Sequence, residues 1–114
     1  MKGRDNMMRL SGLLILTFAL TAPINQARSD NAAMALGKKV FLELAEPQCA
    51  LCHTLADAGS TGPVGPVLDD LKPTADRVRT AVTKGVGPMP ANTILTREQI
   101  DAVALYISTV TGAR

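Results

Sequence analysis

Both cysteines of the chain and its only histidine fall within five consecutive residues, Cys49-Ala50-Leu51-Cys52-His53. In this C-x-x-C-H sequence, one turn of near-helical backbone would place the two thiols on the same side of the chain. Thiols and an imidazole at such close spacing can form a redox-active dithiol, part of a zinc site, a plain disulfide, or an attachment site for c-type haem.

Covalent attachment of haem is the interpretation that uses all three residues. Each thiol can add to a vinyl group of haem and form a thioether, and the next residue then presents its imidazole to the iron. A thioredoxin-like dithiol would require a βαβ unit, which the sequence does not contain, and a structural zinc site would require a fourth ligand. A plain disulfide leaves the adjacent histidine without a role. The motif therefore predicts one haem c, bound through Cys49 and Cys52, with His53 on the iron.

A second ligand on the iron would have to be a methionine, because the chain has no second histidine. Met34 shares a predicted helix face with Val40 and Phe41, which is typical of a core position. Met89 instead lies in a loop between two prolines, which restrict its backbone and hold it out of a helix. Met89 is therefore the predicted ligand, and the alternative is that it fills a gap in the core.

The N-terminal residues have the pattern of a secretory signal peptide. Residues 1–9 carry three basic side chains and one acidic side chain, and residues 10–22 form an apolar run. As a helix this run would cover about 20 Å, which is short of the roughly 30 Å that a membrane span requires. We predict a signal peptide over residues 1–27, cut near Ala27, rather than a buried helix or an uncleaved anchor. The exported domain, residues 28–114, would then be periplasmic, with no permanent membrane span.

Composition excludes several other classes of protein. With 46% hydrophobic and 19% charged residues, the chain is neither an acidic disordered segment nor a coiled coil. The net charge of +2 falls to zero when the basic N-terminal segment is removed, so nucleic acid is not an expected partner. Aromatic residues make up only 3% of the chain, which leaves the core without its usual bulk. A large apolar cofactor would supply it.

The domain is predicted to be all-α, because no segment alternates polar and apolar residues for long enough to predict a strand. One helix is expected over Asp30 to Ala45, with Asp30 as its N-cap, and a second over Thr74 to Lys84, stopped by Gly85. The last helix begins at a capping box formed by Thr96 and Gln99 and ends near Thr111. Residues 54–71 and 85–90 are rich in Gly and Pro and are predicted to be loops.

Over nearly the whole predicted exported domain, the chain resembles class I monohaem c-type cytochromes. The resemblance rests on Gly37-Lys38-Lys39-Val40-Phe41, Cys49 to His53, Gly65-Pro66-Val67-Leu68, Met89-Pro90 and Ala104-Leu105-Tyr106-Ile107. It implies the cytochrome c fold, with three to four helices around one covalent haem, and a close crossing of Gly37 with the Tyr106 region. It also implies that the backbone carbonyl of Pro66 accepts a hydrogen bond from His53. The haem-binding residues implied in this way are Cys49, Cys52, His53, Pro66 and Met89.

Ligation of the iron by both His53 and Met89 would leave no open position for a substrate. The resemblance therefore implies a periplasmic carrier of single electrons rather than an enzyme. Its donor would be a periplasmic dehydrogenase, and its acceptor a terminal oxidase or another cytochrome. Two alternatives remain at this point: a permanent haem subunit of an oxidoreductase complex, and a haem enzyme or gas sensor with an open sixth site.

Within the family, the stretch from Gly37 to Met89 is similar to small cytochromes that accept electrons from bacterial sulfite dehydrogenases. This similarity suggests a sulfite dehydrogenase as the donor. Four lysines could form a patch near an exposed haem edge, although ordinary solvated lysines would look the same in the sequence: Lys38, Lys39, Lys72 and Lys84.

Overall fold

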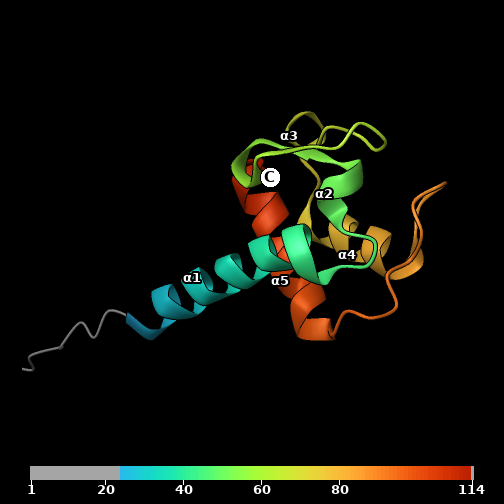
Figure 1. The fold of residues 1–114 in the computed structure, drawn as a ribbon. Coiled ribbons are helices and arrows are strands. Elements are labelled where there is room, and N and C mark those ends of the chain that lie inside the picture. Colours follow the sequence, from blue (N-terminus) through green and yellow to red (C-terminus); the bar gives the residue numbers. More distant parts are fainter. Residues whose placement is uncertain (1–23, 114) are drawn as a thin grey trace, which may run out of the picture.

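The computed structural model describes residues 24–113, and their fold is all-α, as predicted (Figure 1). Residues 1–23 of the predicted signal peptide lie outside the described part. Within residues 24–113, no helix is both long and apolar enough to span a membrane. The elements follow the chain in the order α1 (Ile24–Lys39), the π-helical turn η1 (Val40–Leu44), α2 (Cys49–Cys52), β1 (Thr54–Leu55), the 3-10 turn η2 (Ala56–Ala58), β2 (Ser60–Thr61), α3 (Leu68–Leu71), α4 (Ala75–Lys84) and α5 (Arg97–Val110).

Helix α1 begins at Ile24, six residues before the predicted N-cap at Asp30, so the predicted start was wrong. The residues before Asp30 contain no Gly or Pro from Ile24 onward, and nothing in them stops a helix. All of residues 24–32 are exposed, and in Figure 1 this half of α1 projects away from the rest of the domain. The helical stretch continues through η1 and ends at Leu44, close to the predicted end at Ala45.

The close packing of α1 against α5 is made possible by Gly37. A Cβ atom at this position would lie 2.5 Å from the Cβ of Tyr106 and would overlap the backbone carbonyl of Ala102. Just beyond the crossing, η1 buries Val40 and Phe41 completely, and the Phe41 ring meets the Tyr106 ring edge-on, with 6.4 Å between centroids. The expected approach of Gly37 to Tyr106 is therefore present.

Helices α4 and α5 begin and end close to where the sequence predicts. The side chain of Thr74 caps α4, and Gly85 follows its last residue with φ +73°; Thr96 and Gln99 form the capping box of α5. Residues Val78 and Val82 bury one face of α4. These ends are well predicted because capping depends on a few neighbouring residues.

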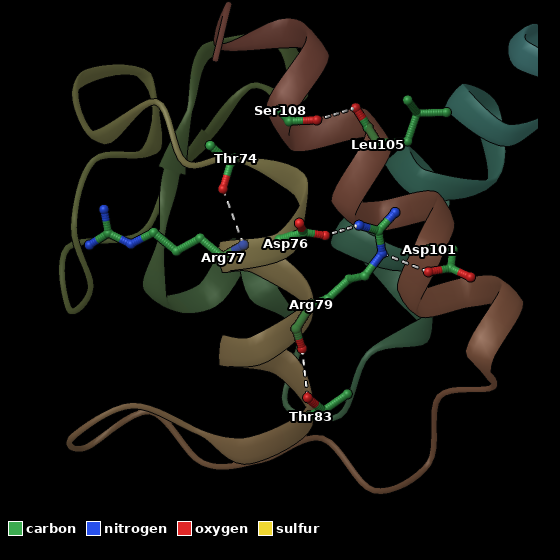
Figure 2. Close-up of polar contacts among 8 residues, drawn as sticks. All are labelled: Thr74, Asp76, Arg77, Arg79, Thr83, Asp101, Leu105 and Ser108. Carbon is green, nitrogen blue, oxygen red and sulfur yellow. Dashed lines mark hydrogen bonds and ion pairs between the residues drawn. The ribbon is translucent and has the colours of Figure 1, made fainter. Parts of the chain in front are cut away.

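An ion pair joins the exposed sides of α4 and α5. Figure 2 shows the Arg79 guanidinium donating to Asp101 on α5 and to Asp76 on its own helix, each over 2.7 Å. The Arg79 side chain is 40% exposed, so the pair adds at most about 1 kcal/mol to the free energy of unfolding. The burial of Val78 and Val82 therefore accounts for more of the packing between the two helices.

The predicted loop over residues 54–71 contains short regular pieces. Strands β1 and β2 pair antiparallel over two residues each, around η2, and α3 is a single turn. The hydroxyl of Tyr106 on α5 donates to Asp57 of η2 over 2.5 Å, and Lys38 on α1 donates to the same carboxylate over 3.2 Å. Lys38 is therefore paired with Asp57 and is not part of a free lysine patch. These hydrogen bonds lower the pKa of Asp57, while burial and the bond to Asp57 raise the pKa of Tyr106.

Replacement of Gly37 by alanine tests the helix crossing. Helix propensity alone favours alanine over glycine by about 1 kcal/mol. The added methyl group would meet backbone atoms of α5 that cannot move aside, so we expect Gly37→Ala to lower the free energy of unfolding by about 1–3 kcal/mol. Chemical denaturation of the purified protein measures this change. Ala35→Gly, at an exposed position of the same helix, reports the propensity term separately. A Gly37→Ala protein as stable as the unchanged chain would contradict the close crossing.

Candidate functional site

The predicted site residues line one cavity of about 390 Å³ that lies between the helices and three of the loops. The walls come from η1, α2, α3, α4 and α5 and from three loops, which lie before α2, after β2 and between α4 and α5, and they are mainly apolar. All five residues proposed from the sequence lie in these walls: Cys49, Cys52, His53, Pro66 and Met89.

Helix α2 is the single turn that carries the two cysteines. Its geometry follows the prediction from the spacing, because Cys49 and Cys52 both reach the cavity while Leu51 between them is 61% exposed. The amide of His53 donates to the carbonyl of Cys49 over 2.9 Å and closes the turn. His53 itself has extended backbone, so its ring leaves the helix axis and enters the cavity wall.

The electrostatics of Cys49 are unlike those of a redox-active dithiol. Burial raises the pKa of its thiol to about 11, whereas reactive dithiols lower the pKa of one cysteine to form a nucleophilic thiolate. The cavity therefore favours a cysteine pair that holds a group covalently over one that exchanges disulfides.

The imidazole of His53 is fixed by the loop that follows β2. Its Nδ1–H donates to the carbonyl of Pro66 over 2.9 Å, and in the neutral ring this tautomer has its lone pair on Nε2, where it can bind a metal. A Cβ atom on Gly65 would lie 2.5–3.0 Å from three ring atoms, so the ring packs directly on this glycine. The amides of Val64 and Gly65 donate to the carbonyl of Cys52 over 3.1 and 2.7 Å and hold the loop against α2.

Met89 enters the same cavity from the loop between α4 and α5. A tight turn holds it, because the amides and carbonyls of Val86 and Met89 exchange hydrogen bonds of 3.0 and 2.9 Å. Gly87 supplies the positive φ of +51° that this turn requires, and Pro88 follows it. The prediction that residues 85–90 are not helical is confirmed, and the half-buried Met89 side chain lies in the wall of the cavity.

Three contributors to the site were not identified from the sequence. Gly62 and Gly65 were assigned only to a loop or a family motif, yet a Cβ atom on Gly62 would lie 2.5 Å from backbone atoms of Cys52 and His53. Asn92 also lines the cavity, and its side chain bonds to Glu46, far away in the chain. A glycine followed by a proline near the C-x-x-C-H motif is a weak signal for the first two, and no local signal marks Asn92.

The donor set and the cavity fit a covalently bound haem. Two thiols on one side of a helical turn suit the two thioether bonds, an imidazole with a free Nε2 suits the iron, and apolar walls suit the faces of the macrocycle. A thioether from Met89 is available in the same cavity. Polar side chains are few in the lining: apart from His53 they are Gln48, Arg77 and Asn92.

Comparisons with known proteins agree with this fit. Residues 32–107 match the family described as cytochrome C oxidase, cbb3-type, subunit III. The structure is similar to that of the c-type cytochrome SorU from Sinorhizobium meliloti, with 68% sequence identity and a TM-score of 0.71. The similarity covers 72% of this chain and 94% of SorU. No curated protein matches the chain. The family match includes Gly37, the C-x-x-C-H motif, Met89 and Tyr106.

Gly65→Ala tests the packing of the imidazole. The methyl group would overlap the His53 ring, and moving the ring would break its hydrogen bond to Pro66. We expect a loss of about 1–3 kcal/mol in the free energy of unfolding, as for other overpacked sites. Val64→Ala, at a neighbouring position that is 74% exposed, serves as the control and should change little. Equal stability of the two variants in chemical denaturation would show that the ring does not depend on Gly65.

Proposed function

The chain belongs to the cytochrome c family, and on that premise we propose that it carries single electrons between other redox proteins. Family membership and the spacing of Cys49 and Cys52 give it one covalently bound haem c. That group supplies a one-electron couple between ferric and ferrous iron. The chain determines how the couple is ligated, how far it is shielded from water, and which proteins can reach it.

The observation that carries the proposal is that His53 and Met89 line one cavity. We propose that His53 and Met89 are the two side chains that would hold the iron of the bound haem. The hydrogen bond from Nδ1 to Pro66 supports this role for His53, because it fixes the tautomer and raises the basicity of the ligating nitrogen. With both positions filled, no site remains for a substrate, and electron transfer is the chemistry left to the chain.

The apolar walls of the cavity favour the reduced state of the haem iron. Residues Phe41, Val82 and Val103 in the walls are buried and apolar, and they exclude water from the site. The reduced iron carries less positive charge, so an apolar surrounding penalises it less than the oxidised iron. A methionine ligand acts in the same direction, and together these features support a higher reduction potential than a bis-histidine site would have.

A sulfite dehydrogenase in the periplasm is the electron donor that we propose. The similarity of residues 37–89 to cytochromes that serve such enzymes supports this donor, and the 68% identity to the c-type cytochrome SorU supports the role as a redox partner. The predicted signal peptide over residues 1–27 supports the periplasmic location. Oxidation of one sulfite to sulfate releases two electrons, so two copies of this chain would each accept one and pass it to a cytochrome or terminal oxidase.

Met89→Ala tests the ligation of the iron. The unchanged, oxidised protein should show the weak far-red charge-transfer band of methionine-ligated ferric haem, and the variant should lack it. The variant should also bind carbon monoxide without denaturation, and its reduction potential should fall by on the order of 0.1 V, within the roughly 0.8 V range that axial ligands control. Met34→Leu, which alters the other methionine of the described chain, should keep the band. A band that survives Met89→Ala would refute this ligand.

Reduction by a sulfite dehydrogenase tests the donor. The oxidised protein, mixed with a bacterial sulfite dehydrogenase and a limiting amount of sulfite, should be reduced in a ratio of two haems per sulfite. A productive pair should associate at about 10⁵–10⁷ M⁻¹s⁻¹, which stopped-flow absorption resolves. Sulfite without the enzyme and an unrelated monohaem cytochrome as acceptor are the controls. Reduction no faster than that of the unrelated cytochrome would exclude this donor but would leave the role as an electron carrier intact.

A further inference from the structure

We propose that Asn92 is a positioning residue. Its hydrogen bonds hold the Met89 loop against the haem cavity and so keep Met89 on the iron. The inference rests on the proposed ligation by Met89 and adds a residue that controls how long that bond lasts. Asn92 lies three residues after Met89, lines the same cavity and is half-buried.

Asn92 makes four hydrogen bonds that can anchor the loop. Its Nδ2 donates to the carbonyl of Glu46 over 3.2 Å, and its Oδ1 accepts from the amides of Ile94 and Leu95, each over 3.2 Å. Its own amide donates to the carbonyl of Val82 on α4 over 2.8 Å. One residue therefore shapes the second half of the loop and ties it to two separate elements.

The bond to Glu46 connects two different walls of the cavity. Glu46 lies between η1 and α2, three residues before Cys49, whereas Asn92 belongs to the loop that carries Met89. Within residues 24–113, no other side-chain hydrogen bond joins residues 85–95 to residues 45–48. The side chain of Asn92 thus links the wall that binds haem covalently to the wall that supplies the proposed sixth ligand.

The hydrogen bond between Asn92 and Glu46 protects the proposed bond between Met89 and the iron, which is otherwise easy to break. The turn from Val86 to Met89 is closed by hydrogen bonds within the loop itself, and these do not hold the loop against the cavity. Met89 can leave the iron by a swing of the whole turn, provided that the attachment at Asn92 gives way. A neutral thioether has little electrostatic attraction to hold it, so the attachment of the loop governs its departure.

Two substitutions separate the functions of the side chain. Asn92→Asp keeps the oxygen that accepts from Ile94 and Leu95, but it cannot donate to Glu46 and places a negative charge beside that carbonyl. Asn92→Ala removes both kinds of bond. Thr96→Ala is the matched control, because it removes the side-chain cap of α5 without touching the loop or the cavity lining.

The experiment measures how fast cyanide, at saturating concentration, replaces the native ligand in the oxidised haem protein. We expect both Asn92 variants to exchange about tenfold faster than the unchanged protein, the effect of losing one structural hydrogen bond. Thr96→Ala should remain within about twofold, although it loses a stabilising cap. Retention of the far-red band by the variants before cyanide is added would show that Met89 starts on the iron.

The outcomes distinguish this inference from the proposed function. If the band is present and the Asn92 variants exchange at the rate of the unchanged protein, the positioning role is overturned and the ligation by Met89 stands. If only Asn92→Asp exchanges at the rate of the unchanged protein, the role of the hydrogen bond to Glu46 is overturned. Absence of the band from the unchanged protein would overturn the ligation by Met89 itself.

Discussion

At position 37 the chain has no room for a side chain, because the backbone of Ala102 and the Cβ of Tyr106 already fill the space. Helices α1 and α5 can approach this closely only with a glycine there. Just after this crossing, η1 buries Val40 and Phe41 completely. Since Phe41 lines the cavity as well as contacting Tyr106, one wall of the haem site is positioned by a contact between the two ends of the domain.

The same helix crossing also helps to position His53, through the short hairpin formed by β1, η2 and β2. Tyr106 holds Asp57 at the tip of the hairpin, and inside the hairpin the hydroxyl of Ser60 donates to the carbonyl of His53 and accepts from the amide of Leu55. The backbone of His53 is thereby fixed from one side, while Pro66 fixes its ring from the other. A side chain held at both ends keeps its orientation when the charge beside it changes, which suits the proposed role of His53 as a ligand of the iron.

How much of this arrangement is visible in the sequence depends on the range of each interaction. The ends of α4 and α5 and the C-x-x-C-H turn depend on residues within four positions of one another, and the sequence predicts them well. The start of α1 was missed because Asp30, a good cap, follows residues that are themselves compatible with a helix. Bonds such as those of Asn92 to Glu46, 46 residues apart, and Tyr106 to Asp57, 49 apart, leave no local pattern. The contact between the His53 ring and Gly65 is equally hard to predict, because most loop glycines serve the backbone turn and not a neighbouring ring.

The haem site and the hydrophobic core are largely the same set of side chains. Seven residues belong both to the buried cluster and to the cavity walls: Phe41, Ala45, Leu68, Val78, Val82, Val103 and Ile107. A group bound there completes the core instead of resting on a surface, which explains how a domain with so few aromatic residues can bury enough apolar area. Stability and reduction potential therefore depend on shared contacts. A substitution that opens one of these walls removes apolar burial and admits water to the iron, so it weakens the fold and stabilises the oxidised state together.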